Sequence, residues 1–164
     1  MLCLLAIPVA NSASSRARVT SVSALDSQVV REVNRVRAQH GLTPLVRSSS
    51  LTRAAASHSR SMATDGYFTH ESANGSVFWQ RIKLYYSASG HKYWAVGENL
   101  VWASPSLTAK QAVKMWMNSA PHRANLLSAK WREIGLSAVY SSDAPGSYQD
   151  RAATIVTADF GVRR

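Results

Sequence analysis

The chain of 164 residues has a single cysteine, Cys3, and few acidic residues. One cysteine cannot form a disulfide within the chain, which excludes a disulfide scaffold and also a four-cysteine zinc site. No apolar run approaches the roughly 20 residues that a membrane-spanning helix requires. The chain has 19 Lys and Arg residues but 9 Asp and Glu residues, which gives a formal net charge of +10. Such an excess favours polyanionic surroundings: nucleic acid, an anionic wall polymer or a membrane surface.

Two common catalytic signatures are also missing from the sequence. His70 is followed by Glu71, but no second histidine stands at the spacing of a His-Glu-x-x-His zinc motif. No Gly-x-Ser-x-Gly nucleophile elbow occurs. Ser119 and His122 are three residues apart, but Pro121 between them disfavours a helical Ser–His dyad. No local motif therefore predicts an enzyme.

The start of the chain differs in composition from the rest. The apolar residues 2–10 and the small residues after them are typical of a secretory signal peptide, to which we assign residues 1–13. The basic residues that normally precede such a run are missing, since the first positive charge is Arg16, so this peptide is expected to be incomplete at its start. The alternative is a loosely packed apolar tail. Residues 14–24 are expected to be a leader to one domain over 25–164.

Hydrophobic periodicity predicts helices first and strands last, in a chain long enough for one domain with a core. The predicted helices cover residues 26–40, 51–65, 77–84 and 108–119. Alternating apolar residues predict strands over 134–140 and 152–160, joined by a turn-rich segment. Helices followed by strands favour an α+β fold over alternating βαβ units.

Three residues stand out as candidate site residues: His70, Glu98 and His122. His70 ends an aromatic run that begins at Tyr67, which anchors the segment and leaves the imidazole at its edge. Pro121 is predicted to end the preceding helix, so that His122 is presented at a helix terminus. Glu98 lies between a glycine and an amide in an otherwise apolar stretch, where a generic solvated carboxylate is not expected.

Other histidines and tryptophans are assigned mainly structural roles. His58 falls on the inward stripe of its helix and is predicted to be a hydrogen-bonded, partly buried histidine rather than a ligand. Trp116 is predicted to lie in the core. Trp94 and Trp102 flank the Glu98 segment; we expect them in the core as well, with the lining of a ligand groove as the alternative.

Short sequence pieces spread over residues 25–161 form a recognisable pattern. The pieces are, in order, Asn34-Arg35-Val36-Arg37, His40-Gly41-Leu42-Thr43-Pro44-Leu45, Leu51 with Ala54-Ala55, His58-Ser59, Met62-Ala63, Tyr67-Phe68-Thr69-His70, Gly97-Glu98-Asn99-Leu100, Trp116-Met117-Asn118-Ser119, His122-Arg123-Ala124-Asn125-Leu126-Leu127, Ile134-Gly135 and Asp159-Phe160-Gly161. Each piece alone is a weak signal, but their order is specific. In this order they resemble the CAP superfamily (the SCP domain of cysteine-rich secretory proteins, antigen 5 and pathogenesis-related proteins), in its bacterial branch without cysteines.

The resemblance implies a three-layer α-β-α sandwich with a central antiparallel sheet. It also implies a cleft lined by His70 as the first histidine, Glu98 as the first glutamate and His122 as the second histidine. The eukaryotic pattern has a second glutamate where this chain has Ser119, which removes one negative charge and one hard oxygen ligand. Glu133 would compensate only if the loop that follows His122 folded back.

Two hypotheses follow for the chemistry of this cleft. Two neutral imidazoles and one carboxylate are a three-ligand set for Zn²⁺ that leaves a position for water, so His70, Glu98 and His122 are a candidate divalent-metal site. The alternative is a hydrogen-bonded His–Glu–His cluster that holds loops together. Binding of metal would depend on pH, because histidine ligates only in its neutral form.

The resemblance implies a secreted, monomeric, non-catalytic binding domain for a lipid, an envelope component or a host-surface ligand. The second hypothesis is a metal-assisted hydrolase or peptidase in which Glu98 acts as general base and the histidines as ligands. The basic residues form no tract and no aromatic interleaving, so we expect a cationic coat suited to anionic envelope or host-surface components rather than a specific nucleic-acid site. These basic residues include Arg31, Arg35, Arg47, Arg53, Arg60, Arg81, Lys110, Arg123, Arg132 and Arg151.

Overall fold

The computed structural model describes residues 18–164, so the predicted signal peptide over residues 1–13 lies outside the described residues. The helices are α1 (Ser23–Gln39), α2 (Ser49–Asp65), α3 (Phe78–Tyr85), α4 (Ala109–Asn118) and α5 (Ala120–Leu126). The strands are β1 (Val19–Ser21), β2 (Val46–Arg47), β3 (Trp94–Ala103), β4 (Glu133–Ala144) and β5 (Arg151–Arg163). None of the helices in this part of the chain is long and apolar enough to cross a membrane.

The sheet is antiparallel apart from one short strand. Its order is β1-β4-β5-β3, and neighbouring strands in this path run antiparallel. The two-residue strand β2 pairs with β4 in parallel. Among the described strands, β3 pairs with β5 alone, so β3 forms one edge of the sheet.

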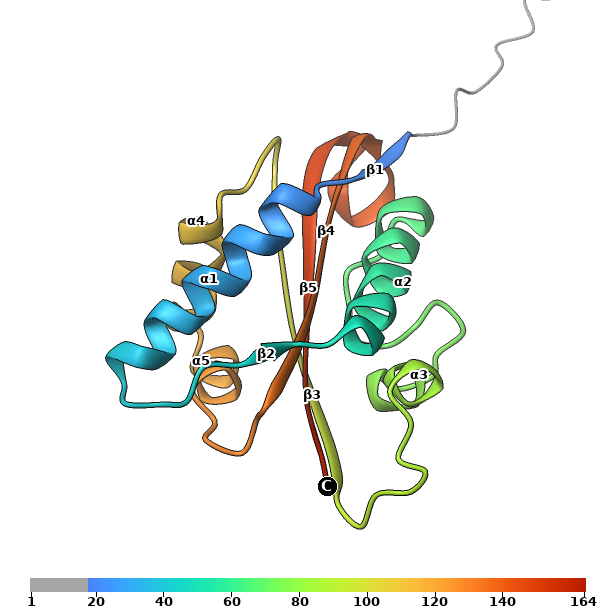
Figure 1. Cartoon of the computed structure of the whole chain (residues 1–164). Helices are drawn as coiled ribbons and strands as arrows, with labels where there is room; N and C mark the ends of the chain where they lie inside the picture. The colour runs from blue at the N-terminus through green and yellow to red at the C-terminus, as the bar shows by residue number, and fades with distance from the viewer. Residues whose placement is uncertain (1–17) are drawn as a thin grey trace, which may run out of the picture.

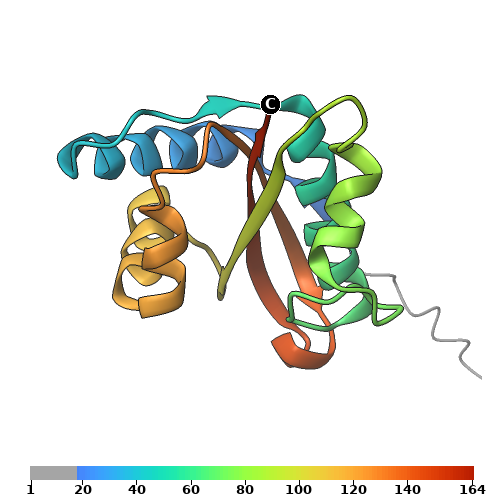
Figure 2. The same cartoon turned by 90° about the horizontal axis from the view of Figure 1, so that it is seen from below.

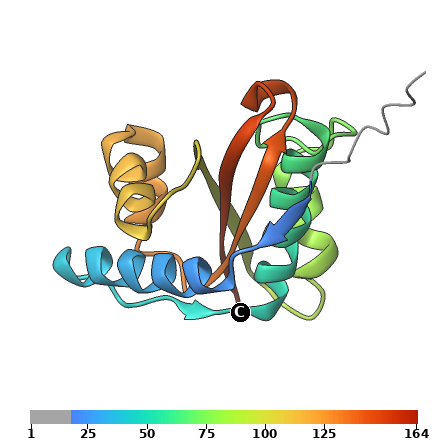
Figure 3. The ribbon, with the colours of Figure 1, turned by 90° about the horizontal axis from the view of Figure 1, so that it is seen from above.

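Helices cover both faces of this sheet (Figure 1). The helices α1, α4 and α5 lie on one face, and α2 and α3 lie on the other (Figure 2). The view from above shows the same division, with the sheet between the two helical layers (Figure 3). The expected α+β fold and three-layer α-β-α sandwich are therefore confirmed.

The layer formed by α1, α4 and α5 contains the largest core cluster. Val29 and Val33 of α1 are fully buried, as the helical periodicity predicts, and Trp116 of α4 is buried with them. On the other side of this cluster Trp131 stacks on Phe160 of β5, with the ring centroids 6.1 Å apart. The burial of these aromatic rings fixes the α4–α5 unit against the sheet.

Pro121 begins a helix, whereas it was predicted to end one. Thr108 opens α4 with a capping box, in which its Oγ1 accepts from the Gln111 N–H and the Gln111 side chain accepts from the Thr108 N–H. After α4 the chain starts a new helix, and Pro121 lies in the first turn of α5. A proline fits there because the N–H groups of a first turn have no partner within the helix. His122 therefore lies at the beginning of a helix rather than after the end of one.

Two further segments differ from the sequence-based expectation. The segment 14–24 was expected to be a leader, but Val19 to Ser21 form β1 on the edge of β4, and α1 already begins at Ser23. The strand β3 was not predicted, because Gly97 and Glu98 interrupt its apolar pattern. Both segments owe their conformation to pairing with distant strands.

The helix α2 approaches β4 closely at a glycine. A Cβ atom at Gly135 would lie 2.0 Å from the carbonyl carbon of Leu51 and 2.2 Å from the nitrogen of Thr52. Both of these are backbone atoms, which cannot swing aside as a flexible side chain does. The depth at which α2 packs on the sheet therefore requires glycine at position 135.

We expect Gly135→Ala to lower the free energy of unfolding by at least ~3 kcal/mol, because α2 would have to move off the sheet. Urea denaturation measures the loss. Gly41→Ala is the matched control, since Gly41 has a φ of +68° but a Cβ there would meet nothing within 4 Å. The control is expected to cost about 1 kcal/mol from backbone strain alone. Equal losses in the two variants would contradict the packing argument.

Candidate functional site

The three candidate residues reach one place from three different elements. Glu98 is on the edge strand β3, His70 follows α2 in the loop that leads to α3, and His122 is in the first turn of α5. Nδ1 of His70 lies 2.8 Å from Oε1 of Glu98. The imidazole rings of His70 and His122 have their centroids 6.4 Å apart. The fold thus brings together residues that the sequence analysis singled out separately.

The cleft straddles the edge of the sheet, because successive side chains of a strand point to opposite faces. Glu98 points into the α2–α3 layer, where it meets Arg81 of α3. Its neighbour Asn99 points to the opposite face, and its Nδ2 donates to the carbonyl oxygen of His122 at 3.0 Å. His70 is therefore held on the α2–α3 side of the sheet, and His122 is held on the α5 side.

Asn125 of α5 ties this helix to the backbone of β3. Its Nδ2 donates to the carbonyl oxygen of Glu98 at 3.2 Å and to Oδ1 of Asn99 at 3.0 Å. Its Oδ1 accepts from Nε1 of Trp131 at 3.1 Å. A Cβ atom at Gly97 would lie 2.6 Å from the same Oδ1, so the close approach of α5 needs the glycine that precedes Glu98.

A buried ion pair fixes the position of Glu98. The side chains of Arg81 and Glu98 are 7% and 0% exposed, and Nη2 of Arg81 donates to Oε2 of Glu98. Nη1 of Arg81 donates to the carbonyl oxygen of His70 and to Oγ of Ser72, each at 3.1 Å. Both carboxylate oxygens of Glu98 therefore have partners, and the same arginine also holds the backbone of His70.

A second carboxyl group lies beside this ion pair. Asp159 of β5 is opposite Glu98 in the strand register and is fully buried. Within residues 18–164, neither oxygen of Asp159 has a hydrogen-bond partner. Burial, and then the nearby charge of Glu98, raise the pKa of Asp159 well above its usual value. Asp159 is thereby favoured in its neutral form, so that Glu98 alone balances the charge of Arg81.

Arg81 is not part of the cationic coat to which the sequence analysis assigned it. The other basic residues of that set are exposed, whereas Arg81 is buried next to Ile82 on the inner side of α3. The sequence analysis also missed Asp159 and Asn125 as site residues. The signal that identified Glu98, a polar residue in an apolar stretch, applies equally to Asp159 between buried neighbours on β5.

The two imidazoles of the cleft are held differently. Nδ1 of His70 interacts with Glu98, which leaves Nε2 as the free ring nitrogen. Burial, and then the neighbouring His70, lower the pKa of His122. This favours the neutral imidazole at position 122, with one nitrogen available as a hydrogen-bond acceptor.

Two cavities that share His122 form the cleft. The polar cavity, of about 490 Å³, is lined by residues that include His70, Glu98, His122 and Asn125. The apolar cavity, of about 280 Å³, is lined by Phe68, Leu100, Val101, Trp102, Met115, Trp116, Ser119 and His122. Trp102 thus lines the groove, which was the alternative to a core position. Trp94 packs elsewhere and donates its Nε1 to the carbonyl oxygen of Tyr86 at 2.9 Å.

A second glutamate, Glu71, lines the polar cavity together with Glu98, but position 119 itself carries a serine. Ser119 lines the apolar cavity at the position that the resemblance gave it. Glu133 does not replace the missing carboxylate, because it accepts a hydrogen bond from the hydroxyl of Tyr86 in the α3 region.

Within residues 18–164, the cleft residues are not arranged as a three-ligand zinc site, so metal binding by His70, Glu98 and His122 stays a prediction. Among the residues that the structure describes, no three His, Cys, Asp or Glu side chains are arranged to hold a metal ion. The reason is that Glu98 turns its two oxygens to His70 and Arg81. The imidazoles of His70 and His122 remain as donors, which is fewer than the three protein ligands of catalytic zinc sites. Glu98 instead orients a histidine, as carboxylates behind histidines commonly do.

His58 is a buried, hydrogen-bonded histidine, as predicted. It is 1% exposed, its Nε2 lies 3.0 Å from the carbonyl oxygen of Thr69, and the hydroxyl of Tyr67 lies 3.5 Å from its Nδ1. Because a carbonyl oxygen can only accept, Nε2 carries the proton. Burial lowers the pKa of His58 to about 4.

Comparison with known proteins identifies a family for most of the chain. Residues 30–160 match the model of the cysteine-rich secretory protein family (CAP). The uncharacterized protein YkwD of Bacillus subtilis is 34% identical over 122 residues, which are 74% of this chain and 45% of that protein. The uncharacterized membrane protein YlbC of the same species is 29% identical over 112 residues, 68% of this chain and 30% of that protein. The chain thus spans less than half the length of these relatives.

Solved structures show the same fold. An extracellular SCP-domain protein from Bacillus anthracis superimposes with a TM-score of 0.66 at 24% identity, over 87% of this chain and 41% of that chain. An outer surface protein from Borrelia burgdorferi superimposes with a TM-score of 0.72 at 19% identity, over 90% and 99% of the two chains. At these identities the likeness establishes the fold alone.

Replacement of both members of the buried ion pair is expected to cost less than the sum of the two single replacements. Arg81→Met or Glu98→Met alone leaves a buried charge unpaired, and each should lower the free energy of unfolding by about 3–5 kcal/mol. The double variant should lose clearly less than the sum, which urea denaturation of all four proteins measures. Arg35→Met is the control, because Arg35 pairs with Glu32 on the surface and its loss should change stability little. Additive losses would refute the coupling.

The depressed pKa of His58 makes stability depend on pH. The unfolded chain takes up a proton near the ordinary histidine value of 6.5, but the folded chain resists it until about pH 4. The free energy of unfolding should therefore fall as the pH drops from about 6.5 to about 4, by ~3 kcal/mol from this residue. His58→Gln keeps a donor for the Thr69 carbonyl but does not titrate, so its stability should fall less over this range. Parallel pH profiles in urea denaturation would show that His58 is not responsible.

Proposed function

The chain belongs to the cysteine-rich secretory protein (CAP) family, and from this premise we propose that it is a secreted, non-catalytic domain whose cleft binds a lipid-like amphiphile. The observation that carries the proposal is the pair of adjoining cavities that meet at His122. An apolar chain would occupy the apolar cavity, and the polar group would reach the imidazoles of His70 and His122.

The walls of the apolar cavity suit a hydrocarbon group. Phe68 and Trp102 pack edge to face, with ring centroids 6.5 Å apart, and form an aromatic wall. Met115 adds a flexible thioether that is 46% exposed in the free protein. Covering such surface removes apolar area from water and favours binding. Methionine adapts to ligands of varied shape.

The surface charge supports an anionic surrounding. The exposed basic residues lie on many elements, so the +10 charge forms a coat rather than a patch. A coat of this kind attracts anionic envelope or host-surface components over a distance set by the salt concentration. It would raise the local concentration of an amphiphile with an anionic head, while the cleft supplies the selectivity.

The geometry favours binding over the hydrolase alternative. A general base must reach the water that it deprotonates. The side chain of Glu98 is 0% exposed, and its oxygens interact with His70 and Arg81. Glu98 therefore acts by holding His70 and Arg81 in place, and the lining of the two cavities includes the imidazoles, Ser119, Asn125, the exposed Glu71 and Lys130, and apolar side chains.

A charge placed in the apolar cavity tests this proposal. Met115→Asp should weaken binding of a fluorescent fatty acid such as cis-parinaric acid by about tenfold or more, because the carboxylate would be desolvated against the hydrocarbon chain. Val46→Asp introduces the same charge at an exposed apolar residue of β2 that lines neither cavity of the cleft, and it should leave binding unchanged.

A mass-spectrometric inventory of lipids that copurify with the secreted protein would identify the natural ligand. Equal binding by wild type and Met115→Asp would contradict the proposed cavity. Turnover of an ester or peptide substrate would instead favour the hydrolase, if the His122→Ala variant is folded but has lost this activity.

A further inference from the structure

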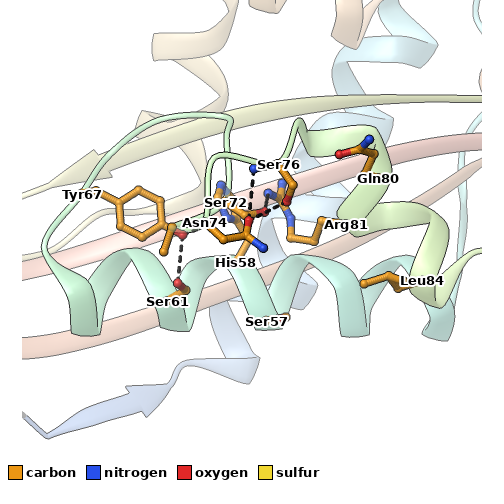
Figure 4. Close-up of a pocket in the computed structure, with 11 residues that line it drawn as sticks. Ser57, His58, Ser61, Tyr67, Ser72, Asn74, Ser76, Gln80, Arg81 and Leu84 are labelled. Carbon is orange, nitrogen blue, oxygen red and sulfur yellow. Dashed lines mark hydrogen bonds between the residues drawn. The ribbon is translucent and has the colours of Figure 1, made fainter.

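A separate cavity lies behind Arg81, between α2, α3 and the loop that joins them (Figure 4). We call it the α2–α3 pocket; its lining includes Ser57, Tyr67, Ser72, Asn74, Gln80 and Arg81. Its volume of about 430 Å³ lies within the ~300–1,000 Å³ typical of small-molecule sites. It shares no lining residue with the polar or the apolar cavity of the cleft.

The lining of the α2–α3 pocket is rich in neutral hydrogen-bonding groups. Serine hydroxyls come from α2 and from the loop, and the amides of Asn74 and Gln80 come from the loop and from α3 (Figure 4). Tyr67 adds a phenolic hydroxyl. Leu84, which is 83% exposed, supplies an apolar surface. Hydroxyls and amides beside the apolar side chains of Leu84 and Ala73 match a ligand that has both hydroxyl groups and C–H faces.

Several of these groups keep hydrogen-bonding capacity for a ligand. Within residues 18–164, the side chains of Ser57 and Gln80 make no hydrogen bond. Asn74 uses Oδ1 to accept from the N–H and the hydroxyl of Ser76, which leaves its NH₂ group as a donor. Oγ of Ser72 accepts from Arg81, so its own proton is available.

The pocket offers no free charge to an ionic ligand. The guanidinium group of Arg81 is paired with Glu98. His58, which also lines the pocket, stays neutral near pH 7 because burial lowers its pKa to about 4. A wholly apolar ligand would leave the hydroxyls and amides without partners, which costs binding energy.

We propose that the α2–α3 pocket is a second binding site, and that it takes a small neutral saccharide. The hydroxyl groups of the sugar would bond to Ser57, Ser72, Asn74 and Gln80, and a C–H face would cover Leu84. This site is distinct from the cleft, since the two regions share no lining residue, and Arg81 links them through its bonds to Ser72 and to the carbonyl oxygen of His70.

Titration of the ¹⁵N-labelled protein with N,N′-diacetylchitobiose or with cellobiose tests the proposal. We expect saturable shifts of the backbone amide signals of residues 57, 72–76 and 80, with an affinity that does not change with salt, because a neutral ligand is not screened. Gln80→Ala should weaken binding about two- to tenfold through the loss of a hydrogen bond. Ser57→Trp should remove saturation because it fills the pocket from the exposed side of α2.

Gln28→Ala is the matched control, since Gln28 is an exposed helical glutamine on α1, in the opposite layer. It should bind as the wild type does. The absence of saturable shifts with both sugars would overturn the proposal. So would shifts confined to the cleft residues, binding that weakens with salt, or unchanged binding in Ser57→Trp. Because the cleft variant Met115→Asp does not touch this pocket, loss of amphiphile binding leaves the saccharide result unaffected.

Discussion

The buried ion pair of Arg81 and Glu98 is the constraint on which the arrangement of the cleft depends. Two charges removed from water are tolerated when they meet each other and when their remaining hydrogen-bonding positions are filled. Here Nη1 of Arg81 donates to the carbonyl oxygen of His70 and to Oγ of Ser72, and the second oxygen of Glu98 interacts with the His70 ring. Within residues 18–164, Nε of Arg81 is the one nitrogen of this guanidinium group that is buried without a hydrogen-bond partner. One pair thereby joins α3, β3 and the loop after α2. His70 is held twice by it, through its backbone and through its imidazole.

The opposite side of the cleft is built by a different device. Asn125 and Asn99 link α5 to the edge strand β3 through amide groups, and Gly97 allows the close approach. The carbonyl oxygen of His122 is part of the same network. An edge strand ordinarily leaves backbone groups unpaired. In this fold the side chain of Asn125 on α5 bonds to the backbone of the edge strand. This contact places His122 next to His70, which belongs to the other layer.

The sequence could predict the elements whose structure depends on local pattern. The helical stripes of α1, α2 and α4 and the alternation of β4 and β5 were sufficient for the α+β class. The strand β3 was not predicted, because Gly97 and Glu98 interrupt its apolar pattern. Gly97 allows the close approach of α5, and Glu98 pairs with Arg81. Pro121 was ambiguous, since proline both follows and begins helices. The burial of Arg81 depends on a partner 17 positions away. The set of His70, Glu98 and His122 was identified by its resemblance to a family pattern, and its convergence requires the tertiary structure.

The orientation of Glu98 changes the chemical character of the cleft. As a list of residue types, two histidines and a glutamate indicate a metal ligand set or a general base. In the fold the carboxylate is buried and paired with Arg81, while Asp159 beside it is favoured in its neutral form. A ligand in the polar cavity therefore meets the two imidazoles beside the exposed Glu71 and Lys130, whereas the charge of Glu98 that holds His70 is buried. That cavity adjoins the aromatic wall of Phe68 and Trp102, so polar and apolar groups lie within reach of one amphiphilic molecule. A buried charge thus acts on function indirectly, because it determines the position of the His70 imidazole.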